Sequence, residues 1–267
     1  MQGVVLAAGE GTRLRPLTAD RPKALVTVDG RPICSWCFDR LLDAGVDELV
    51  VVVGYLGDRI RERYGDAYRG VPVRYATQDE RLGVAHALAC AEEYVDGPFP
   101  YLHGDNVFDP AADLSAVPRL LRDGADAVLT VEGVSRERAR ETGVVVPAGD
   151  GNVVADTDGD RIDRLDADRI DRLDGDRIDR IVEKPDDPPS TLAITGLHGF
   201  SPSVFDACRA IDPSDRGEYE LPDAITWLLR TGHRVQAVRF EGWRVAVDYP
   251  EDRDRAERLI RGSGSGG

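Results

Sequence analysis

The sequence predicts an α/β fold of three layers, in which helices cover both faces of a mostly parallel central sheet in a Rossmann-like arrangement. Strand-like and helix-like runs alternate through the first half of the chain. The strand-like runs are continuously apolar, as in parallel strands that are buried on both faces. A glycine-rich loop follows the first strand, and such sheets bind ligands at the carboxyl ends of their strands. With 267 residues, 42% of them hydrophobic, the chain can bury a full-sized core.

The first three elements are a strand, a helix and a strand. Residues 3–9 (GVVLAAG) form a buried strand that ends in the glycine-rich loop. Residues 33–44 have helical apolar spacing and are closed by Gly45, and residues 48–55 form a continuous apolar strand. The alternation continues with a helix at 58–65, a strand at 71–78, a helix at 83–95, a strand at 99–108 that ends in a polar turn, a helix at 113–122 and a strand at 125–134.

Three tandem octads, DGDRIDRL, DADRIDRL and DGDRIDRI, occupy residues 158–181. Their apolar residues give no single apolar face on a helix or on a strand. We therefore expect an elongated exposed hairpin or a partly disordered insertion within a single domain (1–261), followed by a flexible Gly/Ser tail (262–267). The acidic runs suggest calcium, but a loop counted from Asp156 has Arg161 where an EF-hand requires glycine, so calcium is disfavoured.

The charge balance excludes some partners. The chain has 34 basic and 49 acidic residues, for a net charge of −15, which argues against a nucleic-acid-binding surface. It uses 34 Asp and 32 Arg but two Lys, a composition that we interpret as adaptation to high salt. The sequence contains no run of 18 apolar residues, so it predicts no membrane span. The N-terminus also lacks the basic region of a signal peptide. We expect a cytoplasmic protein.

Cys34 and Cys37 form a C-x-x-C pair, which would suit a redox couple or half of a zinc site. No second pair completes a tetrahedral site, and the surrounding apolar spacing is that of a helix packed on a core. We predict buried structural thiols.

The first loop region, LAAGEGTRLRPLTADRPKAL (6–25), combines glycines with cations. It is not a dinucleotide-binding fingerprint, because Leu14 occupies the position of the third glycine, and it lacks the G-K-[ST] of a P-loop. Glycines let backbone N–H groups approach an anion, and Arg13, Arg15 and Lys23 supply countercharge, so we predict a phosphate site. The alternative, a tight turn with solvated arginines, suits Arg15 best.

This loop carries a resemblance. G-x-G-T-R-L-x-P-L-T followed by R-P-K-x-L resembles the opening motif of the nucleoside-diphosphate-sugar pyrophosphorylases, or sugar-1-phosphate nucleotidyltransferases, and the likeness extends through most of residues 1–260. It implies an enzyme that transfers a nucleotidyl group from a nucleoside triphosphate to a sugar 1-phosphate and releases pyrophosphate, with Mg²⁺ as cofactor. The segment QDERLGVAHAL most resembles members that use UTP or dTTP with glucose 1-phosphate. The sequence does not decide whether the chain forms a homo-oligomer.

The resemblance also implies the residues that bind each substrate. Arg13 and Lys23 would neutralise the pyrophosphate, and Lys184 would hold the attacking phosphate. The nucleotide would contact Leu6, Ala8, Gly9, Gly11, Thr12, Gln78 and Gly83, and the sugar phosphate would contact Gly143, Glu183, Lys184, Gly196 and Arg216.

Asp105, in LHGDNVF, corresponds to a metal ligand of the family, and the second ligand departs from the pattern. Many members have W-x-D-V-G-T-P-E-D, whereas this chain has WRVAVDYPED, which places Ala246 at the usual acid. Asp248 follows two residues later, and residues i and i+2 of a strand share a face, so we expect it to reach the metal. An alternative role for Asp248 is to cap the helix that follows.

The sequence also allows two functions other than the transfer to a sugar 1-phosphate. The Ala246/Asp248 arrangement also suits a cytidylyltransferase that acts on a polyol or alditol phosphate. A non-catalytic nucleotide-sugar-binding regulatory subunit is disfavoured, because Arg13, Lys23 and Asp105 occur together. In addition, both lysines of this lysine-poor chain lie in candidate phosphate motifs, as expected where a compact charge is required.

Overall fold

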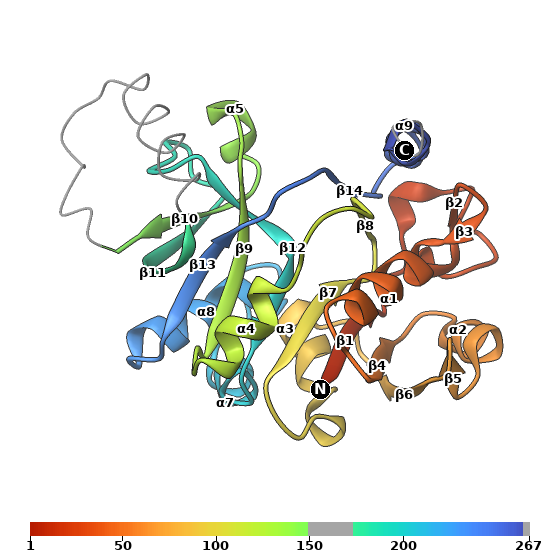
Figure 1. The fold of residues 1–267 in the computed structure, drawn as a ribbon, viewed down its shortest axis with the longest axis horizontal. Helices are drawn as coiled ribbons and strands as arrows, with labels where there is room; N and C mark the ends of the chain where they lie inside the picture. Colours follow the sequence, from red (N-terminus) through yellow and green to blue (C-terminus); the bar gives the residue numbers. More distant parts are fainter. Residues whose placement is uncertain (149–172, 264–267) are drawn as a thin grey trace.

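The computed structural model describes residues 1–148 and 173–263, and ten strands of these ranges form one sheet (Figure 1). The expected α/β class is confirmed. The strands lie in the order β10 (Gly143–Pro147), β11 (Asp174–Glu183), β13 (Val235–Arg239), β9 (Ala127–Gly133), β12 (Leu192–Phe200), β7 (Phe99–His103), β1 (Gln2–Ala7), β4 (Glu48–Val53), β6 (Val71–Thr77) and β5 (Ala67–Tyr68).

The sheet has a parallel half and a mixed half. Neighbouring strands from β7 to β6 all pair in parallel, as the apolar runs predicted. In the other half β13 and β9 are parallel, while β12 runs antiparallel to both β7 and β9 and β11 runs antiparallel to β13 and β10. Most strands therefore share one direction, and β12, β11 and β5 oppose it. The strands that break the pattern lie mostly in the second half, where the simple alternation of strand and helix runs stops.

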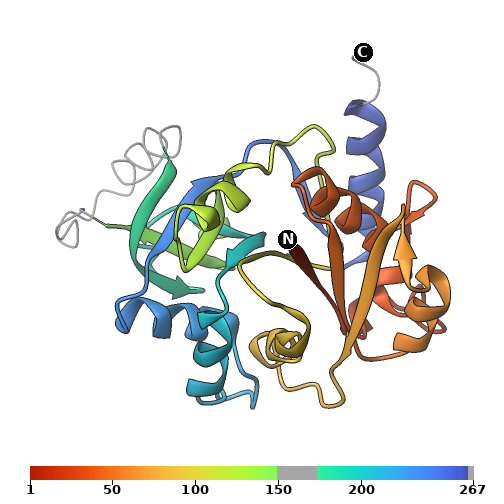
Figure 2. The ribbon, with the colours of Figure 1, turned by 60° about the horizontal axis from the view of Figure 1, so that its bottom comes forward.

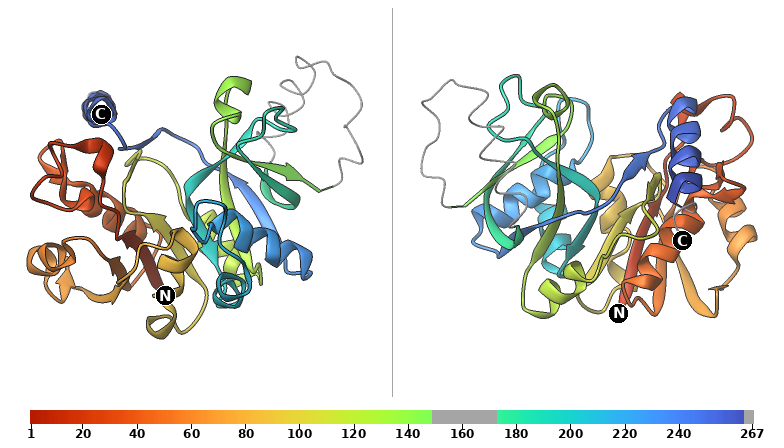
Figure 3. Two further views of the ribbon diagram at one scale, coloured as in Figure 1. Left: turned by 180° about the vertical axis from the view of Figure 1, so that it is seen from behind. Right: turned by 45° about the horizontal axis from the view of Figure 1, so that its top comes forward.

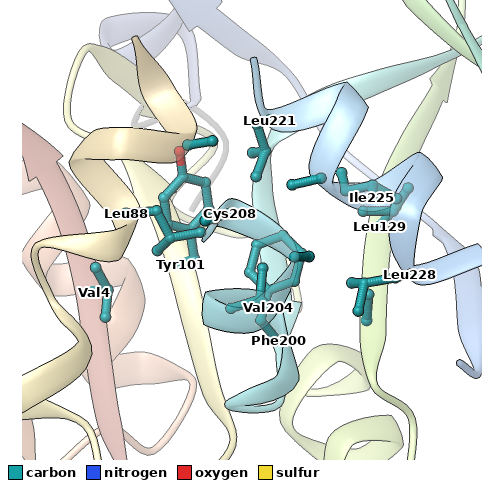
Figure 4. Close-up of a cluster of buried hydrophobic side chains, with 14 of the residues drawn as sticks. Val4, Leu88, Tyr101, Leu129, Phe200, Val204, Cys208, Leu221, Ile225 and Leu228 are labelled. Carbon is teal, nitrogen blue, oxygen red and sulfur yellow. The ribbon is translucent and has the colours of Figure 1, made fainter. Parts of the chain in front are cut away.

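Buried side chains on both faces of the sheet explain the continuous apolar runs. Val4 packs in one cluster with α3 (Val84–Ala89), α7 (Ser203–Ala210) and α8 (Leu221–Arg230), as Figure 4 shows. Its neighbour Val5 packs on the opposite face with α1 (Ile33–Asp43), α2 (Gly57–Tyr64) and α4 (Ala116–Arg122). Figure 1 shows α1 and α4 in front of the sheet, and the left panel of Figure 3 shows α7 and α8 from the other side. Each such fully buried side chain contributes roughly 1.5–3 kcal/mol.

A third, smaller cluster joins the two ends of the chain. The strand β14 (Arg244–Ala246) pairs antiparallel with β8 (Asn106–Phe108), and β2 (Thr27–Val28) pairs with β3 (Arg31–Pro32). Apolar residues of these strands pack with Ala256 of α9 (Pro250–Ser263). Figure 2 shows α9 beside the N-terminal segment. This cluster holds the first loop region, the turn after β7 and the strand β14 together.

Several elements differ from the sequence predictions. The helix expected at 83–95 ends at Ala89 and is followed by the short 3-10 helix η3 (Glu92–Tyr94), and the strand expected at 99–108 is divided by a turn into β7 and β8. The third octad, residues 174–181, lies in β11, and residues 158–172 lie outside the described residues. Cys34 and Cys37 are buried free thiols whose pKa values burial raises, so the structural interpretation is confirmed. No helix in the described ranges is long and apolar enough to cross a membrane.

Candidate functional site

The first loop region leaves β1 between two glycines that follow neighbouring strands. Gly104 donates its N–H to the Leu6 carbonyl at 2.8 Å, and a Cβ at Gly104 would lie 2.5 Å from that oxygen. On the other side, a Cβ at Gly54 would lie 3.0 Å from the carbonyl oxygen of Ala8. A Cβ at Gly9 would meet no atom of the described part of the chain within 4 Å. The chain at the carboxyl edge of β1 is therefore packed tightly on both sides and opens at Gly9.

Gly11 brings Lys23 against the loop. Its φ of 67° is left-handed, and a Cβ there would lie 2.9 Å from the Lys23 Cβ, so glycine is required on both grounds. Thr18 donates its hydroxyl to the Gly11 carbonyl at 2.7 Å. Thr12 begins the 3-10 helix η1 (Thr12–Leu14) directly after Gly11. Lys23 begins a second 3-10 helix, η2 (Lys23–Leu25).

Lys23 is the centre of the site. Its ammonium Nζ lies 2.7 Å from Asp105 Oδ2 and 2.8 Å from Asp248 Oδ1, and the residue is 8% exposed. Burial alone would lower the pKa of Lys23, but the two carboxylates raise it above its ordinary value. Burial alone would likewise raise the pKa of Asp105, yet Lys23 and then His103 offset it and hold that pKa at about 2. The site thus holds a buried cation between two carboxylates.

Arg13 adds a second cation to the same carboxylate. Its Nη2 lies 3.1 Å from Asp248 Oδ1, and its guanidinium carbon lies 5.3 Å from the centre of the Tyr249 ring. The contact with Tyr249 and the charge of Asp248 raise the pKa of Arg13. More than half of the Arg13 side chain is exposed, so it can move to a ligand more easily than Lys23.

The β8–β14 pair brings the two carboxylates together. Ala246 pairs with Asn106, and the N–H of Val247 donates to the Asp105 carbonyl at 2.9 Å. Asp248 therefore emerges beside Asp105, and its carboxylate bonds to Lys23 and Arg13. Asp252, in the first turn of α9, accepts at Oδ2 from the N–H of Tyr249 at 2.8 Å and from the N–H of Asp248 at 3.0 Å.

This donor set fits a hard divalent cation. Two carboxylates converge on one positive charge, which is where a metal ion held by both would lie, and Mg²⁺ prefers oxygen ligands. Within residues 1–148 and 173–263, no group of three or more His, Cys, Asp or Glu side chains could hold a metal. An ion bound here would complete its shell with substrate phosphates and water, as Mg²⁺ commonly does.

Gln78 and Gly83 lie together, as expected. Gln78 is 6% exposed and donates its amide to the Gly83 carbonyl at 3.1 Å, with His86 Nδ1 at 3.0 Å. Gly83 has a φ of 101°, and a Cβ there would lie 2.6 Å from the Tyr219 carbonyl oxygen. The N–H of Tyr219 in turn donates to the Leu82 carbonyl at 2.7 Å. The chain near residue 219 therefore braces this segment.

The residues expected at the sugar phosphate form a separate group. Gly143 pairs with Glu183 across β10 and β11, and a Cβ at Gly143 would lie 2.8 Å from a Glu183 carboxylate oxygen. Lys184 has a φ of 42° and its Nζ lies 3.6 Å from Glu183 Oε1. Arg216 pairs with Glu220 at 2.6 Å; that contact raises its pKa most, and Glu183 contributes a smaller effect. Within the described residues, no hydrogen bond or ion pair joins this group to Lys23.

Gly196 links the two groups. A Cβ at Gly196 would lie 2.6 Å from Asn106 Nδ2, so the absent side chain leaves room for the buried Asn106 amide. Asn106 donates to Asp105 Oδ1 at 2.7 Å.

Sequence reasoning missed Asn106 itself and two residues near it, Arg244 and Glu132. Arg244 donates from Nη1 to Asn106 Oδ1 at 3.3 Å, and its Nη2 lies 2.7 Å from Glu132 Oε1. The signal for Asn106 is its place directly after Asp105. Arg244 could have been found from the strand alternation that was used for Ala246 and Asp248, because it lies on the same face.

Glu10 is a further residue that sequence reasoning missed. Its carboxylate pairs with Arg15 at 2.7 Å and also with Arg81, so it joins the first loop region to the segment that follows Gln78. This pairing supports the structural interpretation of Arg15.

A cavity of about 450 Å³ is lined partly by the end of the first loop region but by none of its predicted site residues. It is lined by Arg21, Leu25, Thr27, Gly30, Pro32, Arg59, Glu62 and Arg63. We place the candidate site at the Lys23 charge cluster and not in this cavity, because the carboxylates and the glycine-rich loop converge there.

The chain is similar along nearly its full length to known proteins. The sequence profile of the nucleotidyl transferase family matches residues 2–245. The UTP–glucose-1-phosphate uridylyltransferase AglF of Haloferax volcanii is 45% identical over 262 residues, which cover 98% of this chain and 97% of that protein. The glucose-1-phosphate thymidylyltransferase of Streptomyces antibioticus is 32% identical over 245 residues, or 91% of this chain and 61% of that protein.

Solved structures agree on the fold. A UDP-glucose pyrophosphorylase complexed with UDP-glucose has a TM-score of 0.78 at 20% identity and covers 98% of each chain. The UDP-glucose pyrophosphorylase from Acinetobacter baumanii has the same TM-score at 22% identity and covers 98% of this chain and 96% of its own. At these identities the likeness concerns the fold.

Proposed function

We propose that this chain, which belongs to the nucleotidyl transferase family, joins a nucleoside triphosphate to a sugar 1-phosphate and releases pyrophosphate. The observation that carries the proposal is the cluster of Lys23, Arg13, Asp105 and Asp248 beside a glycine-rich loop at the carboxyl edge of β1. A pair of cations and a pair of carboxylates at one point suit a reaction that moves negative charge between phosphates.

The reaction needs no protein nucleophile. A phosphate oxygen of the sugar 1-phosphate attacks the α-phosphorus of the triphosphate in line, a new P–O bond forms, and the bond to the β-phosphate breaks with loss of pyrophosphate. Arg13 and Lys23 neutralise the charge that gathers on the departing pyrophosphate. The loop residues Leu6, Ala8, Gly9, Gly11 and Thr12 present the backbone to the nucleotide, since close approach of N–H groups to phosphate requires an open loop.

Asp105 and Asp248 would hold Mg²⁺, which supplies charge neutralisation at the phosphates when it is bound. In the structure Lys23 lies between these carboxylates, so the proposal requires its ammonium to turn towards the triphosphate as the metal binds. The first carbons of the Lys23 side chain lie against Gly11, so this movement would come from the bonds beyond its Cγ.

Gln78 and Gly83 would contact the base, and Glu183, Gly143, Gly196 and the cations Lys184 and Arg216 would contact the sugar phosphate. Three observations support this division. The buried Gln78 amide donates to the Gly83 carbonyl. The missing side chain of Gly143 leaves room for the Glu183 carboxylate. The negative charge of Glu183 contributes to the raised pKa of Arg216.

UTP and glucose 1-phosphate are the proposed substrates, and dTTP is the second choice. The relative that is 45% identical along nearly the full length of both chains is a UTP–glucose-1-phosphate uridylyltransferase, and a 32% identical relative is a thymidylyltransferase. The cytidylyltransferase alternative stays open through the Ala246/Asp248 arrangement, because Asp248 and not residue 246 supplies the acid.

Pyrophosphate release tests the proposal directly. The chain is assayed at molar KCl, which suits its acidic composition, with each of four nucleoside triphosphates against glucose 1-phosphate and an alditol phosphate. We expect release with UTP and glucose 1-phosphate, and Arg13→Ala should lower kcat about 10²–10³-fold. Turnover restricted to CTP and the alditol phosphate would support the alternative. Binding of a triphosphate with no release from any pair would refute catalysis.

A further inference from the structure

The Asp105 carboxylate has a partner on each of its two oxygens. Oδ2 accepts from Lys23 at 2.7 Å, and Oδ1 accepts from Asn106 Nδ2 at 2.7 Å. Asn106 is 3% exposed, and an amide of this kind can present either its oxygen or its nitrogen unless a further contact fixes it. What orients the Asn106 amide therefore also orients Asp105.

Arg244 makes that further contact. It donates to the carbonyl oxygen Oδ1 of Asn106, which leaves Nδ2 as the group that faces Asp105. An arginine has no acceptor, so the amide cannot be reversed without placing two donors against each other. Arg244 itself is held by Glu132 at 2.7 Å, its side chain is 14% exposed, and its buried Nε has no hydrogen-bond partner among the residues that the structure describes.

The same short segment controls both oxygens of Asp105. Arg244 and Ala246 lie on one face of β14, Val245 and Val247 are buried in the third cluster, and Asp248 follows just after the end of the strand. Arg244 acts on Oδ1 through Asn106, and Asp248 shares Lys23 with Oδ2. We infer that Arg244 is a positioning residue, which fixes the direction of the Asp105 carboxylate through Asn106 and so sets the divalent-cation affinity of the site. This inference rests on the proposed function of Asp105.

Binding of Mn²⁺ to the intact chain, measured by the electron paramagnetic resonance of free Mn²⁺ without nucleotide, tests the inference. Arg244→Met should weaken the affinity about 10-fold, the lower end of the effect of residues that orient metal ligands. Asn106→Ala should weaken it to a similar extent. The double variant should be barely weaker than either single variant, because both changes break one chain of contacts.

Arg40→Met is the matched control. Arg40 is also a buried arginine, bound to the carbonyls of Asp109 and Ala112, but within the described residues no hydrogen bond joins it to Asn106. Thermal unfolding is followed for every variant, and we expect Arg40→Met to lower the midpoint without changing the Mn²⁺ affinity. An equal loss of affinity in Arg40→Met and Arg244→Met would overturn the inference, because general destabilisation would then explain both.

Asp105→Ala separates this inference from the proposed function. If that variant binds Mn²⁺ as tightly as the wild type, the metal role of Asp105 is refuted, and the positioning role falls with it. If Asp105→Ala loses binding while Arg244→Met keeps wild-type affinity, the positioning role alone is refuted. Losses in Arg244→Met and Asn106→Ala that multiply in the double variant would show that Arg244 does not act through Asn106.

Discussion

Lys23 Nζ lies 2.7 Å from Asp105 Oδ2, although the two residues are 82 positions apart in the chain. Neither group would be stable in this position alone, because burial opposes the charged form of each. Each therefore depends on the other, and Asp248 completes the balance at 2.8 Å.

Lys23→Ala should lower turnover about 10²–10³-fold, because the charge that meets the pyrophosphate is lost. The same change should strengthen Mn²⁺ binding in the absence of nucleotide, since two carboxylates lose the cation that competes with the metal. Titration with Mn²⁺ measures the second effect. Arg15→Ala is the control, because Arg15 pairs with Glu10 and should leave the Mn²⁺ affinity unchanged. Weaker Mn²⁺ binding in Lys23→Ala would contradict the prediction.

Asp105→Ala and Asp248→Ala should each abolish Mg²⁺-dependent turnover, and the double variant should be barely worse than either, as with groups that work as a unit. Initial rates over a range of Mg²⁺ concentrations measure this. Ala246→Asp places a third carboxylate on the face shared with Asp248, so the optimal Mg²⁺ concentration should shift. If Asp248→Ala retains most of its activity, Asp105, phosphates and water hold the metal alone.

The stability of the metal-free protein should depend on Asp105 at acid pH. Its pKa is about 2 in the folded protein and about 3.9 in an unfolded chain. Because the folded pKa is depressed, its stabilising effect is present above pH 4 and is lost as the pH falls towards 2. In urea unfolding with EDTA, the advantage of the wild type over Asp105→Asn should narrow across this range. A gap that stays constant from pH 5 to pH 2 would refute the charge interaction.

Gly83→Ala should raise the KM for the triphosphate and destabilise the chain by more than about 1–3 kcal/mol, the cost of the backbone alone, because φ 101° and ψ 179° lie in a region essentially restricted to glycine. The added Cβ would also meet the Tyr219 carbonyl at 2.6 Å and push apart the segment that holds Gln78. Gly124→Ala is the matched control, since its φ is 86° and a Cβ there meets nothing within 4 Å. Steady-state kinetics and urea unfolding of both variants check this; equal KM values would contradict it.

Removal of sixteen residues from the octad region should leave activity nearly intact if Leu173 is kept. Deletion of residues 157–172 retains Leu173, which is 4% exposed in the core, and β11 still delivers Glu183 and Lys184. Deletion of residues 158–173 has the same length but places Thr157 before Asp174, and should cost about 2–4 kcal/mol more. Urea unfolding and pyrophosphate release compare the two. Equal stability would show that Leu173 contributes little.

The parallel half of the fold was predictable from the sequence, because it depends on local patterns, and the phosphate site in the first loop region stays a prediction that also rests on a local pattern. Buried strands read as apolar runs, and glycines with cations mark a phosphate loop. The antiparallel placement of β12 between β7 and β9 was not predictable, since strand order depends on packing between distant segments. The ion pairs of Lys23 with both Asp105 and Asp248 were not predictable from the sequence either, because no spacing in the sequence relates these three residues.

Asp248 was predicted to reach the site by strand alternation, and the structure places it there. Arg244 obeys the same alternation and was missed, because an arginine in an arginine-rich chain gives no signal of its own. Its contact with Asn106 became visible once the β8–β14 register was known.

The pairing of β14 with β8 also bears on the order in which the site is completed during synthesis. Lys23 and Asp105 leave the ribosome early and can neutralise each other, whereas Asp248 and Arg244 follow more than a hundred residues later. A nascent chain that stops before β14 therefore has the glycine-rich loop and one carboxylate, but neither the second carboxylate nor the arginine behind the amide. A chain truncated after Gly242 should have the same incomplete site and lose its turnover, although all ten strands of the central sheet precede the truncation.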